Sequence, residues 1–267
     1  MKFYKSYFKL RFASSLQYRA AALAGISTQF FFGMIYIFVY LAFYESSKNV
    51  GPMKIEELVS YLWLNQMFFS LIYMFYKDKE IFNLIRNGNV SYELTRPKNL
   101  YFMWYFKIIA QRLSFVTLRC LPILVIAVIL PRPYNLSAPL SITHFLLFIV
   151  ALSIGTLLMT AIITFYHVIT IKHLNEQGIT NIYMAISDLL SGGVVPIPFF
   201  PLFLQKIANV LPFRYVSDLA FRLYSGNIGI KEGLYGILIQ IVWLIVMLVI
   251  GNLTTNKNLK RIVVQGG

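Results

Sequence analysis

The fold is decided by one stretch, SGGVVPIPFFPLFLQKIANVLPFRYVSDLAFRLYSG, which runs from Ser191 to Gly226. Proline inside a helix removes a hydrogen bond and clashes with the preceding turn, so an apolar helix should end at the first three prolines of this stretch. Two apolar segments follow, Leu202–Leu211 and Phe213–Tyr224. Each is shorter than the roughly 20 residues that cross a bilayer. Because bare backbone is costly in hydrocarbon unless protein buries it, the stretch predicts a helical hairpin that dips into one membrane face and returns to it.

The composition is that of an integral membrane protein. Of the 267 residues, 58% are hydrophobic and only 13% are charged, whereas soluble domains are nearer half apolar and a quarter charged. The net charge of +14 could indicate nucleic acid, but the basic residues cluster between hydrophobic runs. They are therefore interpreted as topology determinants beside anionic lipid. The single cysteine, Cys120, lies in an apolar run and excludes a disulfide framework or a thiol metal site.

Hydrophobic runs divide the chain into three regions. Residues 1–19 mix aromatic and basic side chains, residues 20–253 carry the spans, and residues 254–267 form a basic tail. Apolar runs predict six spans, at about 20–44, 58–76, 100–130, 142–171, from 179 to the hairpin, and 233–253. In the fourth, Ser153, Thr156, Thr160 and Thr164 share one face, which favours tight helix packing over a substrate path.

The first 19 residues predict an amphipathic helix in the cytoplasmic interface. Lysines 2, 5 and 9 share one helical face, and Phe3, Tyr7 and Leu10 share another. A disordered basic tail is the alternative interpretation.

Basic residues also predict the orientation. Six spans place both termini on one side, and fourteen Lys and Arg residues fall on that side against seven in the connections on the other. The richer side is cytoplasmic. We therefore expect a multi-pass protein of the cytoplasmic (inner) membrane with both termini inside, the polar loop 77–99 in the cytoplasm and the hairpin 196–226 at the outer face.

The chain has no motif for chemistry. It lacks a Walker A pattern, and its three histidines show no metal-binding spacing. No nucleophile, histidine and acid can be grouped into a catalytic set. The sequence therefore predicts no enzyme site, metal or cofactor in this chain.

Polar residues are nevertheless expected near the bilayer midplane. Asp188 lies nine residues into the fifth span, which is about 14 Å deep at 1.5 Å per residue, and Arg119 falls near the same depth. Asn65 and Gln66 lie near the middle of the second span. Charges inside a membrane normally face a partner or a water-filled path. We predict that Arg119 and Asp188 pair beside a polar layer on a transport route, with a purely structural pair as the equal alternative.

The loop 77–99 contains a second candidate site. Ile81, Leu84 and Ile85 form a short apolar helical face, and Asn87-Gly88-Asn89 ends the helix. A short amphipathic helix in the cytoplasm suits docking in a groove of a soluble partner.

Together these features predict an all-α integral membrane protein. Its elements are an N-terminal interfacial helix, six transmembrane helices, a cytoplasmic helix in 77–99 and a re-entrant outer hairpin between spans five and six. This arrangement resembles the permease subunit of a type-2 ABC exporter (ABC-2 type). Two stretches resemble a subgroup of about 260-residue permeases. One has Gly88, Leu94, Arg96 and Pro97 in a G-x(5)-L-x-R-P pattern, and the other has Pro201, Pro212, Phe213, Tyr224 and Gly226 in the outer hairpin.

The resemblance implies partners and a mechanism. Two permeases, like or unlike, would pair above two soluble ATPase subunits that bind ATP and Mg, and transport would proceed by alternating access. A coupling helix within residues 77–95 would contact the ATPase through Ile81, Phe82, Leu84, Ile85, Arg86 and Gly88. The hairpin would be an extracellular gate built on Pro196, Pro198, Pro201, Pro212 and Phe213. The cargo is expected to be amphipathic or hydrophobic.

Three other readings stay open. One is another transporter class, an importer or a secondary transporter, although the chain shows no internal repeat. Another is a membrane-embedded enzyme, which would need more convergent His, Asp or Glu near an interface. The third is a non-transporting immunity or sensor subunit with the same fold. Recovery of an ATPase with the protein would separate it from the exporter.

Overall fold

The computed structural model describes residues 2–17, 19–46, 51–74, 76–95, 98–171 and 176–259, and these contain helices and no strand. Four helices in this part of the chain are long and apolar enough to cross a membrane by length and composition. They are Ala22–Ser46 within α2 (Arg19–Ser46), α7 (Leu100–Ile129), α8 (Ile142–Thr170) and α12 (Ile230–Leu259). The membrane class of the fold is therefore as predicted. The count of six spans stays a prediction.

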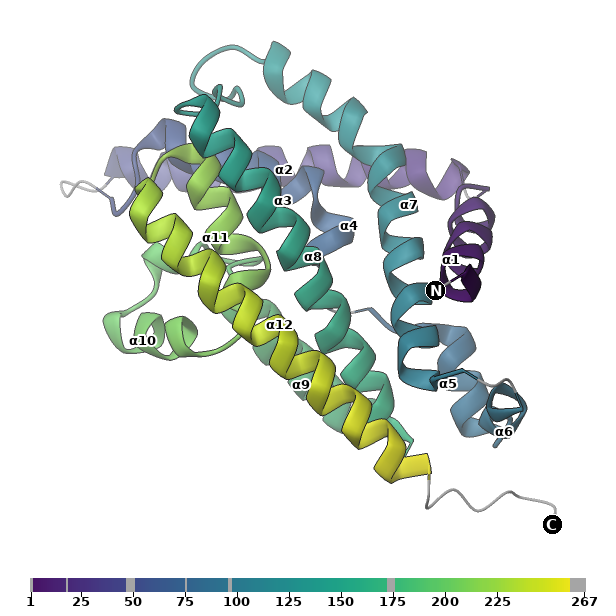
Figure 1. Ribbon diagram of the computed structural model, residues 1–267. Coiled ribbons are helices and arrows are strands. Elements are labelled where there is room, and N and C mark those ends of the chain that lie inside the picture. The colour runs from purple at the N-terminus through teal and green to yellow at the C-terminus, as the bar shows by residue number, and fades with distance from the viewer. Residues whose placement is uncertain are drawn as a thin grey trace.

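Helix α8 is the centre of the bundle. It packs against α12, α7 and α11 (Arg214–Ser225), and α8 and α12 run side by side along the length of the molecule (Figure 1). The backbone of α11 approaches α8 at Gly155, where an added Cβ would lie 2.3 Å from the Val216 carbonyl oxygen. Buried Thr156, Thr160 and Thr164 turn their hydroxyls back to carbonyls four residues earlier. These three residues lie in the tight packing expected for that face, whereas Ser153, predicted on the same face, is exposed.

The second predicted span is occupied by two shorter helices. Helix α3 (Ile55–Met67) has 13 residues, about 20 Å at 1.5 Å per residue, and α4 (Phe69–Ile72) has four. Every residue from 58 to 67 is buried, so α3 is covered on all sides by the rest of the bundle. Helix α4 ends where Arg112 of α7 donates to the carbonyls of Ser70, Leu71 and Tyr73, at 2.9, 3.2 and 2.9 Å.

The stretch from Ser191 to Gly226 forms a break and two short helices. Helix α9 (Glu176–Leu190) ends before the glycines, because Gly192 has a φ of +80° that turns the chain. The helix therefore stops six residues before Pro196, not at the prolines. The prolines lie around η1 (Ile197–Phe199), and α10 (Leu202–Val210) and α11 then match the two short segments predicted.

The remaining helices lie around the start of α7. Helix α1 (Lys2–Ser15) packs along α7 and contains no buried residue. The Tyr4 ring stacks on Phe106 at 5.3 Å, and Leu10 is exposed. Helices α5 (Lys79–Arg86) and α6 (Val90–Leu94) lie at the same end of the bundle as the last turns of α12 (Figure 1).

Candidate functional site

The broken end of α9 is capped by side chains from other helices. The Ser217 hydroxyl donates to the Ser191 carbonyl at 3.0 Å, and the Asn65 amide donates to the Gly193 carbonyl at 3.0 Å. The Tyr61 hydroxyl lies 3.1 Å from the Gly192 carbonyl. Three consecutive carbonyls therefore have donors, which is the condition for ending a helix inside an apolar environment.

A buried carboxylate holds the hairpin to α3. Asp218 is fully buried, and its Oδ2 lies 3.4 Å from Arg214 and 3.6 Å from Arg222 on the same helix. Its Oδ1 lies 3.2 Å from the Tyr61 hydroxyl, which therefore shares one proton between two acceptors. Arg222 also donates to Asn227 at 2.7 Å. This cluster was not predicted from the sequence, although its members are spaced four residues apart along one helix.

A second polar cluster fixes the start of α5. Asp78 caps the helix by accepting from the Ile81 amide at 2.9 Å, and the same oxygen accepts from the Lys107 ammonium at 2.7 Å. Lys107 and Asp78 are 6% and 5% exposed. Burial of two charges requires such pairing. The pair joins two segments 29 residues apart, so no local spacing pointed to it.

Glu80 extends this cluster to α1. Arg11 binds its carboxylate through two hydrogen bonds of 2.9 and 2.7 Å, and Lys107 lies 2.9 Å from it. Burial alone would raise the pKa of Glu80, but the hydrogen bonds from Arg11 and Lys107 outweigh it and lower the pKa to about 2. Helices α1, α5 and α7 are therefore held together by ionised groups.

His167 attaches the same helix to α8. Its Nε2 accepts from the Asp78 amide at 3.0 Å, so its Nδ1 carries the proton and donates to the Ile163 carbonyl at 2.8 Å. The Phe82 ring packs on the imidazole at 4.8 Å. His167 is thus a neutral structural group that orients α5.

The exposed face of α5 differs from the face that the sequence singled out. Ile81 is fully buried, and Leu84 and Ile85 are half-buried against the core. An amphipathic pattern identifies the apolar face but not what covers it, and here the chain's own bundle does. The exposed residues between positions 79 and 94 are polar or isolated apolar side chains, namely Lys79, Glu80, Asn83, Arg86, Asn87, Asn89, Tyr92 and Leu94. Arg96 and Pro97 lie outside the described residues.

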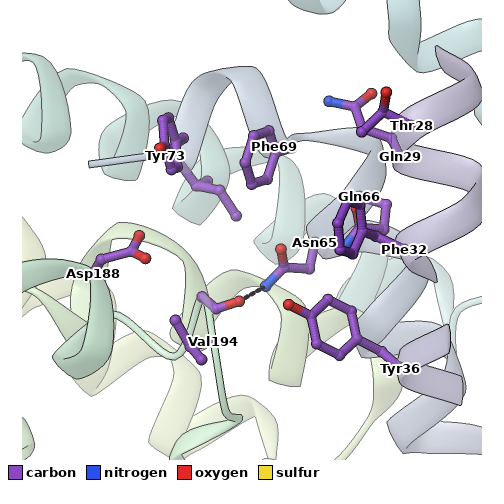
Figure 2. Close-up of a pocket in the computed structure, with 12 residues that line it drawn as sticks. Thr28, Gln29, Phe32, Tyr36, Asn65, Gln66, Phe69, Tyr73, Asp188 and Val194 are labelled. Carbon is purple, nitrogen blue, oxygen red and sulfur yellow. Dashed lines mark hydrogen bonds between the residues drawn. The ribbon is translucent and has the colours of Figure 1, made fainter. Parts of the chain in front are cut away.

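The predicted midplane residues are partly brought together. Asn65, Gln66 and Asp188 line one cavity of about 270 Å³ between α2, α3, α4 and the turn after α9 (Figure 2). Arg119 is not among the residues that line it. Its guanidinium instead lies against Gly25 of α2, where an added Cβ would be 2.5 Å away, and 5.7 Å from the Phe115 ring. Pairing of Arg119 with Asp188 stays a prediction.

The residues predicted for the gate surround the hairpin. Pro196 precedes η1, Pro198 lies within it, and Pro201 precedes α10. Phe213, after Pro212, precedes α11 and contacts both the main core and the small cluster around Ile197 and Ala208. Phe213 therefore links the small cluster at α10 to the main core, whereas α11 packs directly against α8, α3 and α12.

One comparison with known proteins finds a match. A family profile described as "ABC-2 family transporter protein" matches residues 30–266. No curated protein matches the chain, and no solved structure does. The match begins within α2 and covers every element from α3 to α12, so it includes the Asp218 cluster and most of the cavity lining, whereas Arg11, Thr28 and Gln29 lie before it.

Proposed function

Because the chain belongs to the ABC-2 transporter family, we propose that it is the permease subunit of an ATP-driven exporter. The chain itself would neither bind nor hydrolyse ATP, and a partner ATPase would hold ATP and Mg. Two such ATPases would serve a pair of permeases. The cargo would be amphipathic or hydrophobic and would cross the cytoplasmic membrane by alternating access.

The proposed topology has six crossings and both termini in the cytoplasm. Helices α3 and α4 together form the second crossing and α9 forms the fifth, in addition to the four long apolar helices. Two short crossings are supported by burial, since α3 is covered by protein and the end of α9 is capped by side chains. The hairpin α10–α11 is proposed as an outer gate that re-enters the membrane.

The observation that carries the proposal is the way α5 is fastened. Its first turn is bound to α7 by Lys107, to α1 by Arg11 and to α8 by His167. Its other face, with Arg86, and the neighbouring Tyr92, which is 71% exposed, are turned away from the bundle. A force applied by a soluble partner at that face would reach three helices at once. This is the role required of a coupling helix.

A pull-down from native membranes tests the proposal. The permease should recover a soluble ATPase, and Arg86→Glu with Tyr92→Ala should reduce that recovery at least about tenfold, as loss of interface anchors does. These exposed positions avoid the unfolding that Ile81→Asp would cause. Leu202→Ala on α10, which is 77% exposed at the hairpin, is the matched control and should leave recovery unchanged.

The outcomes separate the remaining alternatives. A second, different permease in the same eluate would indicate a heterodimer, and a single permease species a homodimer. If the wild-type protein recovers no ATPase in gentle detergent, the exporter assignment fails and a non-transporting immunity or sensor subunit takes its place. If the protein with Arg86→Glu and Tyr92→Ala recovers as much ATPase as the wild type, α5 and α6 are not the docking site.

A further inference from the structure

The cavity between α2 and α9 has the lining of a cation site. Asp188 enters from one side and Tyr36 from the other, with Asn65 between them (Figure 2). Four aromatic rings line the same space, those of Phe32, Tyr36, Phe69 and Tyr73. Neither Lys nor Arg is among the twelve lining residues, all of which belong to the described part of the chain. The cavity therefore has a carboxylate and negative ring faces but no cation of its own.

A second polar group points to a ligand independently. Gln29 lines the cavity and is 5% exposed, and its Oε1 has no hydrogen-bond partner among the described residues. Buried acceptors are normally paired, so each exception needs an explanation. A donor brought by a ligand, or a water that the ligand orients, would satisfy this oxygen. Asn65 is already committed, because its amide donates to Gly193.

An apolar cavity adjoins the polar one. It has a volume of about 550 Å³ and shares Tyr36 and Val194 with the first. The rest of its lining is almost wholly aliphatic or aromatic, with Val39, Tyr40, Phe43, Tyr44, Gly51, Pro52, Val195 and Phe199. The two cavities thus adjoin each other at Tyr36 and Val194, one with a polar, acidic lining and the other with an apolar lining.

We propose that these two adjoining cavities together bind an amphiphile with an organic ammonium head and an alkyl or aryl tail. The head lies beside Asp188 among the four rings, and the tail lies in the cavity around Tyr40. An ammonium is attracted both by a carboxylate and by the faces of aromatic rings within about 6 Å. The assignment rests on the proposed function, since it specifies the charge class of the cargo.

The lining also distinguishes this ligand from two others. A bare metal ion would use several oxygen ligands at 2.0–2.6 Å, whereas Asp188 is the only carboxylate among the twelve residues that line this cavity, and the described residues contain no cluster of three His, Cys, Asp or Glu side chains. An anionic amphiphile would place its charge against Asp188 with no basic side chain in the lining to offset the repulsion. An ammonium head accounts for both the carboxylate and the rings.

Binding of short amphiphiles to the purified full-length permease in nanodiscs tests this assignment. The probe is octyltrimethylammonium, and the controls with the same tail are N,N-dimethyloctylamine N-oxide, which is neutral at pH 8, and octyl sulfate. Dissociation constants come from calorimetry, with empty nanodiscs as the blank. We expect the cation to bind about 30-fold more tightly than the N-oxide, which is the size of a desolvated cation–π interaction. Octyl sulfate should bind most weakly.

Variants locate the head and the tail. Asp188→Asn should remove the preference for the cation, whereas Glu232→Gln, an exposed acid on α12, should leave it intact. Val39→Gln should weaken the binding of octyltrimethylammonium and leave the affinity for butyltrimethylammonium unchanged. Equal affinity of the wild type for the cation and the N-oxide overturns the proposal, and so does an unchanged preference in Asp188→Asn. The comparison of the cation with the N-oxide uses only the wild-type protein, so it tests the proposal even if a variant fails to fold.

The result is separable from the proposed function. Recovery of the ATPase is measured without amphiphile and does not depend on Asp188. A permease that recovers an ATPase but shows no preference for the cation remains a permease with another cargo. A protein that prefers the cation but recovers no ATPase keeps the site and loses the exporter assignment.

Discussion

Replacement of Lys107 by methionine tests the cluster that fastens α5. Methionine keeps the apolar stem and removes the ammonium, leaving Asp78 buried at 5% exposure without its 2.7 Å partner. Removing one partner of a buried pair costs about 3–5 kcal/mol. Asp78 keeps the Ile81 amide as a donor, so we expect the lower end, about 3 kcal/mol. Lys107→Met also removes the ion pair with Glu80. Because Glu80 is half exposed, solvent screening limits the loss of stability from this pair to less than about 1 kcal/mol.

A second substitution separates charge from packing. Asparagine at position 78 still caps a helix well, but it is uncharged, so loss of Lys107 leaves no unpaired buried charge. The double variant Lys107→Met with Asp78→Asn should therefore recover about 2 kcal/mol relative to Lys107→Met alone. Such non-additivity is what contacting residues show.

The measurement is a double-mutant cycle. The free energy of unfolding in mixed micelles is determined for the wild type, for each single variant and for the double variant. Lys77→Met is the control, because the Lys77 ammonium bonds Asn181 at an exposed site and its loss should cost less than about 0.5 kcal/mol. The reasoning is refuted if the double variant loses the sum of the two single losses. Retention of wild-type stability by Lys107→Met would refute it as well.

Three further perturbations have defined outcomes. Arg112→Met removes the donor to three carbonyls at the end of α4 and should cost about 3 kcal/mol at roughly 1 kcal/mol each, seen in the same unfolding assay. Gly192→Ala places a Cβ 2.6 Å from the Tyr61 hydroxyl at φ +80° and should lower stability by about 1–3 kcal/mol. Glu80 stabilises the fold above its unfolded pKa near 4.5 and loses that contribution as pH falls toward 2, so Glu80→Gln should flatten the acid limb of the stability curve.

The hairpin helices could be predicted closely because their signals are local. The observed Leu202–Val210 ends one residue before the predicted segment, and Arg214–Ser225 is shifted by one residue at each end. Prolines and glycines restrict the backbone wherever they stand. The end of α9 was placed too late because Gly192, which turns the chain at φ +80°, acts before the first proline is reached.

The sequence could not predict which part of the structure packs against the apolar face of each helix. The apolar residues of α5 were assigned to a partner protein, yet Ile81 is buried in the chain's own core. Periodicity says which face is apolar and nothing about its neighbour. The same limit applies to Lys107, which pairs with Asp78 across 29 residues. The Arg214, Asp218 and Arg222 spacing is different, because it lies on one helix and was readable.

Helix α7 joins the two ends of the proposed mechanism. Lys107 binds the first turn of α5, and Arg112, five residues further along, holds the end of α4. Helix α4 contributes Phe69 and Ile72 to the cavity beside Asp188. A displacement of α5 by an ATPase would therefore reach the cavity through direct contacts on one rigid helix. Spatial continuity alone does not establish coupling, so a cycle between Lys107→Met and Arg112→Met, read as amphiphile binding with and without the ATPase, is the decisive measurement.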